Sequence, residues 1–195
     1  MFLIICALKI SLINLYNFNQ LNKKALIIGV DRKEFTDLSQ YLLSRKYTVS
    51  VIRKKRNKIL LKKKNLNKIC SRIIDITKFN DIFNFIKKEK FHSIYYNPKK
   101  FINKTIDKYQ ENIFQNNLIG LSNVLESIRI LNKKIKFINI FYKNNKDCKS
   151  SNDEISVLEN YVSYELIKNY KEVFKLNVIN LKIFYKLENF FLVKQ

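Results

Sequence analysis

Short apolar runs alternate along this chain with longer segments whose apolar residues recur every three or four positions. Apolar runs rich in Ile, Val, Leu or Phe predict β-strands. They lie at residues 24–29, 48–52, 72–76, 93–96, 136–141 and 177–185. Helical spacing predicts helices at residues 34–46, 77–90, 104–131 and 155–174. We expect Thr77 to cap the second helix, because a threonine oxygen can accept a free backbone N–H there.

Strands that alternate with helices indicate a parallel sheet joined by right-handed crossovers. Six such strands predict an α/β, doubly wound, Rossmann-like fold. We expect an apolar N-terminal extension over residues 1–22 and one domain over residues 23–195. The extension lacks the basic leader and small-residue cleavage site of a signal peptide. We therefore expect no membrane contact except through residues 1–20, and lysine-rich exposed loops at 53–68 and 143–153.

The formal net charge of +22 suggests an anionic partner, but the composition favours a simpler explanation. Lysine, isoleucine and asparagine, which all have A/T-rich codons, are inflated together at 32, 28 and 25 residues. Arginine, which nucleic-acid binders use for bidentate contacts, accounts for only six of the 38 basic residues. We therefore favour compositional drift, do not expect a nucleic-acid partner, and keep a basic nucleic-acid-binding protein as an alternative.

The rare residue types exclude several kinds of site. Two glycines cannot form a glycine-rich phosphate loop, and one histidine with three cysteines and no C-x-x-C pair predicts no metal site. The odd, widely spaced cysteines favour a reducing compartment, so we expect a cytoplasmic protein. His92 follows a predicted helix and is typical of a surface residue.

One segment resembles a known family. Asn117-Leu-Ile-Gly120, followed by the run from Asn123 to Leu131, is similar to the N-x-x-G-T-x-N-L-L-E-A segment of the extended short-chain dehydrogenases/reductases. Within it, ESIRIL is close to EAIRIL of the GDP-mannose 4,6-dehydratases. Shorter stretches such as Asp75-Ile-Thr77 and Asn169-Tyr-Lys-Glu172 agree in order and spacing. The resemblance spans residues 23–189 and implies that the family's C-terminal substrate domain is missing.

The resemblance implies an NADP site, and this sequence departs from its pattern. In the family's G-x-x-G-x-x-G turn, Gly29 keeps the first glycine while Arg32 and Phe35 replace the others. Either Arg32 binds phosphate by charge or the turn no longer binds cofactor, and we favour the second reading. Family positions near the 2′-phosphate and the adenine are held by Arg53, Lys54, Lys55, Asp75 and Ile76.

The family's catalytic positions are also altered. Catalysis there needs a Tyr-x-x-x-Lys pair, a Ser or Thr, and a Glu that abstracts a proton. Gapless alignment puts Ser156 in the Tyr position, Asn160 in the Lys position, Tyr142 in the Thr position and Asn144 in the Glu position. The pair Tyr164 and Lys168 spells Tyr-x-x-x-Lys, but it lies eight residues too late for the family pattern.

These residues predict a GDP-mannose 4,6-dehydratase-like protein that is a catalytically inactive remnant or pseudoenzyme of a lyase. An active NADP-dependent nucleotide-sugar dehydratase or epimerase using Tyr164 and Lys168 stays open as an alternative. The family's dimer helices resemble residues 117–131 and 155–174, so the resemblance implies a homodimer or a larger paralogue as partner.

Overall fold

A computed structural model describes residues 23–29, 33–53, 69–97, 107–143, 151–185 and 190–194. The apolar segment 1–22 and most of the loop 53–68 lie outside these residues. The strands are β1 (Lys24–Ile28), β2 (Thr48–Arg53), β3 (Cys70–Ile73), β4 (Ser93–Tyr96), β5 (Lys136–Lys143), β6 (Val178–Tyr185) and β7 (Phe190–Lys194). The helices are α2 (Lys33–Ser44), α3 (Phe79–Glu89), α4 (Asp107–Leu131) and α5 (Ser151–Phe174).

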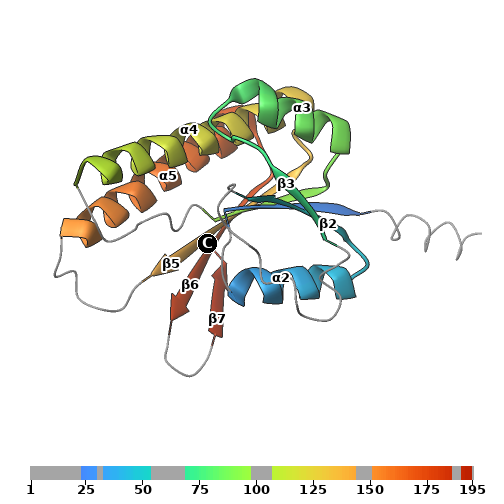
Figure 1. Cartoon of the computed structure of the whole chain (residues 1–195), viewed down its shortest axis with the longest axis horizontal. Coiled ribbons are helices and arrows are strands. Elements are labelled where there is room, and N and C mark those ends of the chain that lie inside the picture. The colour runs from blue at the N-terminus through green and yellow to red at the C-terminus, as the bar shows by residue number, and fades with distance from the viewer. Residues whose placement is uncertain are drawn as a thin grey trace, which may run out of the picture.

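The strands form one sheet in the order β3-β2-β1-β4-β5-β6-β7. The first six strands pair in parallel, and β7 pairs antiparallel with β6. Helices α3, α4 and α5 cover one face of this sheet and α2 lies on the other (Figure 1). The predicted α/β fold with a parallel, doubly wound sheet is therefore confirmed. None of the helices in the described ranges is long and apolar enough to cross a membrane.

Both faces of the central strands are buried, which explains their continuous apolar runs. Leu26 and Ile28 of β1 pack into the cluster beneath α3, α4 and α5, whereas Ala25 and Ile27 join the cluster beneath α2. All four side chains are nearly or fully buried. Full burial of each large aliphatic side chain stabilises the fold by roughly 1.5–3 kcal/mol, so this strand anchors both layers.

Helix α4 lies at the centre of the three-helix layer. Its buried side chains recur at helical spacing and pack against α3, α5 and the sheet; they are Leu121, Val124, Leu125 and Ile128. Ile82 and Ile86 of α3 and Ile167 of α5 belong to the same cluster. The apolar stripe seen in the second half of this helix is therefore core packing.

Gly120 allows α4 to approach the connection between β3 and α3. A Cβ atom at Gly120 would lie 2.5 Å from Cδ1 and 2.8 Å from Cγ1 of Ile76. One turn further along, Nδ2 of Asn123 donates hydrogen bonds of 2.9 Å to the carbonyl oxygens of Ile76 and Thr77. The residues that carry the family resemblance in α4 thus hold this connection in place.

The third strand and the cap of α3 differ from the sequence-based expectation. β3 spans Cys70–Ile73 instead of the expected residues 72–76, and its last residue pairs with Arg53 of β2. Thr77 does not cap α3: its backbone N–H and hydroxyl both donate to Oδ1 of Asp75, at 3.0 and 2.7 Å. The N-cap residue is Lys78, which makes no side-chain capping bond.

Other helix and strand boundaries also differ from the sequence-based expectation, and one strand was not predicted. α2 ends at Ser44, before a turn in which Lys46 has a φ of 63°, and α5 begins at Ser151. β5 extends two residues beyond the expected end at residue 141, so Lys143 belongs to a strand instead of a loop. The last strand, β7, was not predicted; it follows β6 as an antiparallel neighbour.

We predict that Gly120→Ala destabilises the protein by about 1 kcal/mol, because overpacking against Ile76 outweighs the roughly 1 kcal/mol that alanine contributes to a helix. In an Ile76→Ala background the same change should become neutral or stabilising. Urea unfolding of the two single variants and the double variant measures this coupling. Equal effects of Gly120→Ala in both backgrounds would contradict the close contact.

Candidate functional site

The strand order reverses between β1 and β4, which makes the carboxyl ends of these strands the expected ligand crevice. The connection from β1 leads to β2 on one side, whereas β4 leads to β5 on the other. In open α/β sheets, ligands bind outside the carboxyl ends of the strands at such a reversal. Gly29 follows β1 and Asn97 follows β4, and the N–H of Asn97 donates to the carbonyl of Ile28 at 3.0 Å. These two residues flank the crevice.

The turn after β1 keeps one feature of a phosphate-binding turn. Gly29 has a φ of 86°, a conformation that residues with a Cβ rarely adopt, and α2 begins four residues later. Arg32, Lys54, Lys55 and the side chains of Phe35 and Arg53 lie outside the described residues. The backbone at Gly29 therefore keeps the conformation of a phosphate-binding turn, whereas the sequence places long side chains at the other two glycine positions.

Asp75 and Ile76 hold the connection that leads into α3. The Asp75 carboxylate accepts the two hydrogen bonds from Thr77, and the Ile76 side chain packs against Gly120. The Ile76 carbonyl is bound by Asn123. These contacts give both residues a role in local folding beside the adenine-side position that the resemblance implies.

A buried phenol ends β4 and links the sheet to α4 and α5. The hydroxyl of Tyr96 donates to the carbonyl of Asn117 at 2.9 Å, and Nδ2 of Asn117 donates to Oε1 of Glu159 at 2.8 Å. Burial, with a smaller contribution from the nearby Glu159 carboxylate, raises the pKa of Tyr96 far above its usual range. Tyr96 is therefore a neutral hydrogen-bond donor and cannot act as a base at ordinary pH.

Two asparagines lie in register with Tyr96 across the sheet, and the three side chains form a polar row. Tyr96 is in register with Asn139 of β5, which is in register with Asn180 of β6. Asn139 is fully buried, its Nδ2 lies 3.5 Å from Oδ1 of Asn180, and its own Oδ1 has no hydrogen-bond partner within the described residues. Amides and a neutral phenol can hold a polar group, but they cannot transfer protons near neutral pH.

The sequence-predicted catalytic positions lie on different sides of α5. Ser163 and Ile167 are the buried side chains of this helix, at 2% and 0% exposure. Because successive helix residues are about 100° apart, position 160 shares their face. Asn160 is half-buried there, and the side chains of Tyr142 and Ser156, with all of Asn144, lie outside the described residues.

Tyr164 and Lys168 lie beside this buried face. Tyr164 is 37% exposed and Lys168 is exposed, and helical spacing turns Lys168 furthest from the sheet. The structure thus brings Asn160 to the face that meets the sheet and leaves the Tyr-x-x-x-Lys pair at its side.

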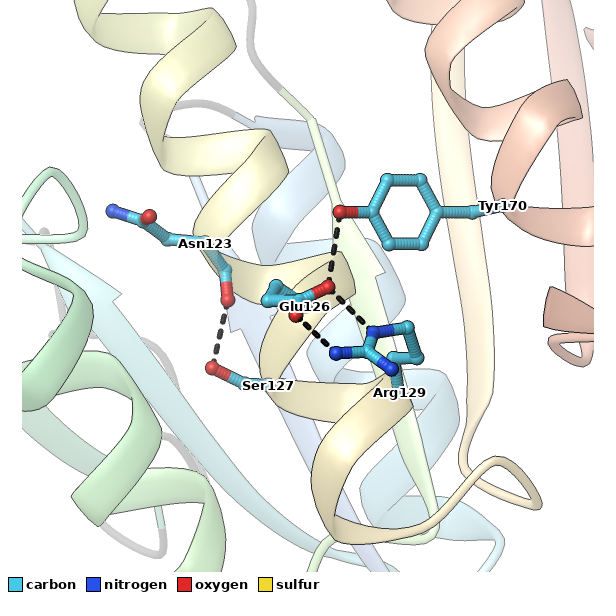
Figure 2. Close-up of polar contacts among 5 residues, drawn as sticks. All are labelled: Asn123, Glu126, Ser127, Arg129 and Tyr170. Atoms are coloured by element: carbon cyan, nitrogen blue, oxygen red, sulfur yellow. Dashed lines mark hydrogen bonds and ion pairs between the residues drawn. The ribbon is translucent and has the colours of Figure 1, made fainter. Parts of the chain in front are cut away.

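A cluster not expected from the sequence joins α4 to α5. Nε and Nη2 of Arg129 donate to the Glu126 carboxylate at 2.8 and 2.5 Å, and the Tyr170 hydroxyl donates to Glu126 at 3.1 Å; Figure 2 shows these contacts. The Arg129 hydrogen bonds lower the pKa of Glu126, and burial raises the pKa of Tyr170. Arg129 also lies over the ring of Phe174, 5.2 Å from its centre. The cluster fastens α5 to α4.

No protein-family model matches the chain, and no curated protein matches it in sequence. Solved structures do match it. A protein assigned to the short-chain dehydrogenase/reductase family from Aeromonas hydrophila shares 13% identity with a TM-score of 0.68, covering 83% of this chain and 81% of its own. The enzyme WbmH of Bordetella bronchiseptica, in complex with NAD⁺, shares 15% identity with a TM-score of 0.59, covering 83% of this chain and 55% of its own.

The UDP-glucose 4-epimerase of Thermus thermophilus, in complex with NAD, shares 12% identity with a TM-score of 0.59. That match covers 82% of this chain and 54% of the epimerase. The chain thus spans about half the length of these larger structural neighbours. At such low identities the likeness establishes a fold shared with nicotinamide-dependent reductases and epimerases.

We predict that Tyr96→Phe lowers the free energy of unfolding by about 0.5–1.5 kcal/mol at neutral pH, because it removes one buried hydrogen bond. The folded-state pKa of Tyr96 is raised, so its contribution is complete below the unfolded-state value of about 10 and is lost as the pH rises further. Urea unfolding near pH 8 and above pH 10 should therefore show a weaker alkaline loss in the variant than in the wild type.

Tyr161→Phe is the matched control for this prediction, since Tyr161 is 63% exposed. Its alkaline loss should equal that of the wild type. The same alkaline loss in Tyr96→Phe and in the wild type would contradict a buried, neutral Tyr96.

Proposed function

We propose that this chain is a catalytically inactive relative of the NAD(P)-dependent nucleotide-sugar epimerases and dehydratases, with GDP-mannose 4,6-dehydratase as the nearest kind. The observation that carries the proposal is the face of α5 that meets the sheet. Its described side chains are Asn160, Ser163 and Ile167. A tyrosine acid/base with a lysine that lowers its pKa is absent from these positions.

The carboxyl end of β4 supports the same proposal. Tyr96 points into the protein and donates to the Asn117 carbonyl, so the phenol at this end of the sheet is used structurally. The polar row from Tyr96 to Asn180 contains amides, which bind polar groups without exchanging protons. The described residues place no acid/base pair beside the crevice, so they offer no group that could exchange a proton with a bound sugar there.

The expected cofactor is NADP by resemblance, with binding weaker than in an active relative. Gly29 would let the chain turn beside a pyrophosphate, and the first turn of α2 would offer free N–H groups. A long side chain at position 32 stands where the family's backbone meets phosphate. The chain would then keep the scaffold of the family without its chemistry.

We predict that the purified protein, incubated with GDP-mannose and NADP, forms no 4-keto product in an assay where an active GDP-mannose 4,6-dehydratase does. A titration of NADPH fluorescence should show no saturable change at concentrations that saturate the active enzyme. Product formation would contradict the proposal. If product forms, loss of activity in Tyr164→Phe with retention in Tyr161→Phe would identify the alternative active enzyme.

We also propose that the partner is a second copy of this chain, bound through the outer surfaces of α4 and α5. Large apolar side chains are exposed on both helices: Ile119, Ile130, Leu158 and Tyr161. Ile119 and Ile130 are eleven residues apart, about three helical turns, and so share one side of α4. Exposed apolar side chains gathered on adjacent helices are typical of association surfaces.

We predict a dimer by size-exclusion chromatography with light scattering, and a monomer for the double variant Leu158→Glu with Tyr161→Glu. Charges placed in an apolar interface cost several kcal/mol, enough to dissociate the dimer. Tyr41→Glu changes an equally exposed tyrosine on α2, on the opposite layer, and should leave the dimer intact. A monomeric wild type, or the same loss in the control, would contradict this partner.

A further inference from the structure

A hollow at the amino-terminal edge of the sheet lies outside the site described above. It has a volume of about 580 Å³ and sits where α3 and α4 end and β4 and β5 begin. Its lining consists of Ile86, Lys87, Lys90, Phe91, His92, Leu131, Asn132, Lys134 and Ile135. Ligand pockets in proteins commonly have volumes of about 300–1,000 Å³, so the hollow is large enough for a small organic molecule. Dinucleotides bind at the opposite, carboxyl edge of such sheets.

The charged side chains among the described lining residues are all lysines, so their charge is positive. Lys87, Lys90 and Lys134 reach it from two separate segments, and none of them forms an ion pair within the described ranges. Among the described residues none contributes a carboxylate to the lining; Glu89, the nearest acid in sequence, pairs with Lys24 at 3.1 Å. The ends of α3 and α4 each contribute roughly half a negative charge, which three ammonium groups outweigh.

The remaining polar side chains also offer donors. Nδ1 of His92 accepts a hydrogen bond from the backbone N–H of Lys24 at 3.1 Å, which assigns the ring proton to Nε2. Oδ1 of Asn132 accepts from the backbone N–H of Lys134 at 3.0 Å, which leaves its NH₂ group to donate. Each side chain thus uses its acceptor within the protein. All five polar residues of the lining thus carry a hydrogen-bond donor, and the ammonium of Lys87 also lies over the ring of Phe83, 6.0 Å from its centre.

The other lining residues are apolar and form a floor. Ile86, Phe91 and Ile135 are almost completely buried members of the main core cluster, and Leu131 is half-buried beside them. This floor is rigid, because its members are also packed against the sheet and α4. An occupant that uses the whole hollow would combine an apolar body with an anionic head.

We propose that this hollow binds a phosphate monoester that carries an apolar organic group. A phosphate dianion offers three acceptor oxygens and suits donors that converge from several directions better than a single carboxylate does. The apolar group would lie against Phe91 and Leu131. This site does not rest on the proposed function and would be present whether or not the crevice at Gly29 binds a cofactor.

Isothermal titration calorimetry with 1-naphthyl phosphate tests the site on the full chain. We expect saturable binding with one molecule per chain, and weaker binding of both inorganic phosphate and 1-naphthol, which carry the head or the body alone. The triple variant Lys87→Gln, Lys90→Gln, Lys134→Gln should bind about tenfold or more weakly, since it loses three charge-assisted hydrogen bonds.

A charge-matched control separates this site from the general basicity of the chain. The variant Lys46→Gln, Lys78→Gln, Lys171→Gln also loses three exposed lysines but leaves the lining unchanged. Its affinity should stay within about threefold of the wild type, because none of these three lysines lines the hollow and exposed charges are screened by salt. No saturable binding to the wild type, or an equal loss of affinity in both triple variants, would overturn the proposal.

A single substitution tests the donor pattern with little risk to folding. Asn132→Asp keeps an oxygen for the Lys134 N–H but replaces the free amide donor with a negative charge. We expect it to weaken binding of 1-naphthyl phosphate by about tenfold, whereas Asn177→Asp, at an exposed position elsewhere, should not. Unchanged affinity in Asn132→Asp would also overturn the proposal.

Discussion

The close approach of α4 to the connection between β3 and α3 is the contact on which the three-helix layer depends. Gly120 leaves room for Ile76, and the Asn123 amide binds the two carbonyls that this connection would otherwise leave without a partner. α4 then holds α5 through Glu126 and Tyr170. The orientation of α5, and with it the identity of the residues that face the sheet, follows from this contact.

The sequence predicted the parts of the fold that are decided by burial. β1 and β4 are buried on both faces, so their apolar runs were sufficient, and the buried stripe of α4 showed its period directly. Element ends that depend on strand pairing or on a side-chain hydrogen bond could not be predicted in this way. The bounds of β3 follow from its pairing with β2 over Cys70–Ile73. The Thr77 hydroxyl donates to the Asp75 carboxylate instead of capping α3. Neither fact is visible in a local pattern.

The candidate site was predicted only in part, for a related reason. Gly29 has the backbone conformation that its place in the turn suggested, whereas Asp75 and Ile76 follow β3 instead of ending it. The hydrogen bonds from Tyr96 to Asn117 and from Asn117 to Glu159 join residues that are distant in sequence, and no periodicity marks them. Asn117 belongs to the segment that resembles the dehydratases, which was the one available signal. That segment turns out to hold helices together.

The antiparallel strand β7 has a consequence for solubility. β6 has eight residues, and one edge of it pairs with β5. Without β7 its other edge would present a long row of unsatisfied N–H and C=O groups on an apolar strand, which is a template for adding foreign strands. The hairpin fills that edge within the chain. Within the described residues the sheet then has two short edge strands, β3 with four residues and β7 with five, and edges that short are poor templates for an added strand.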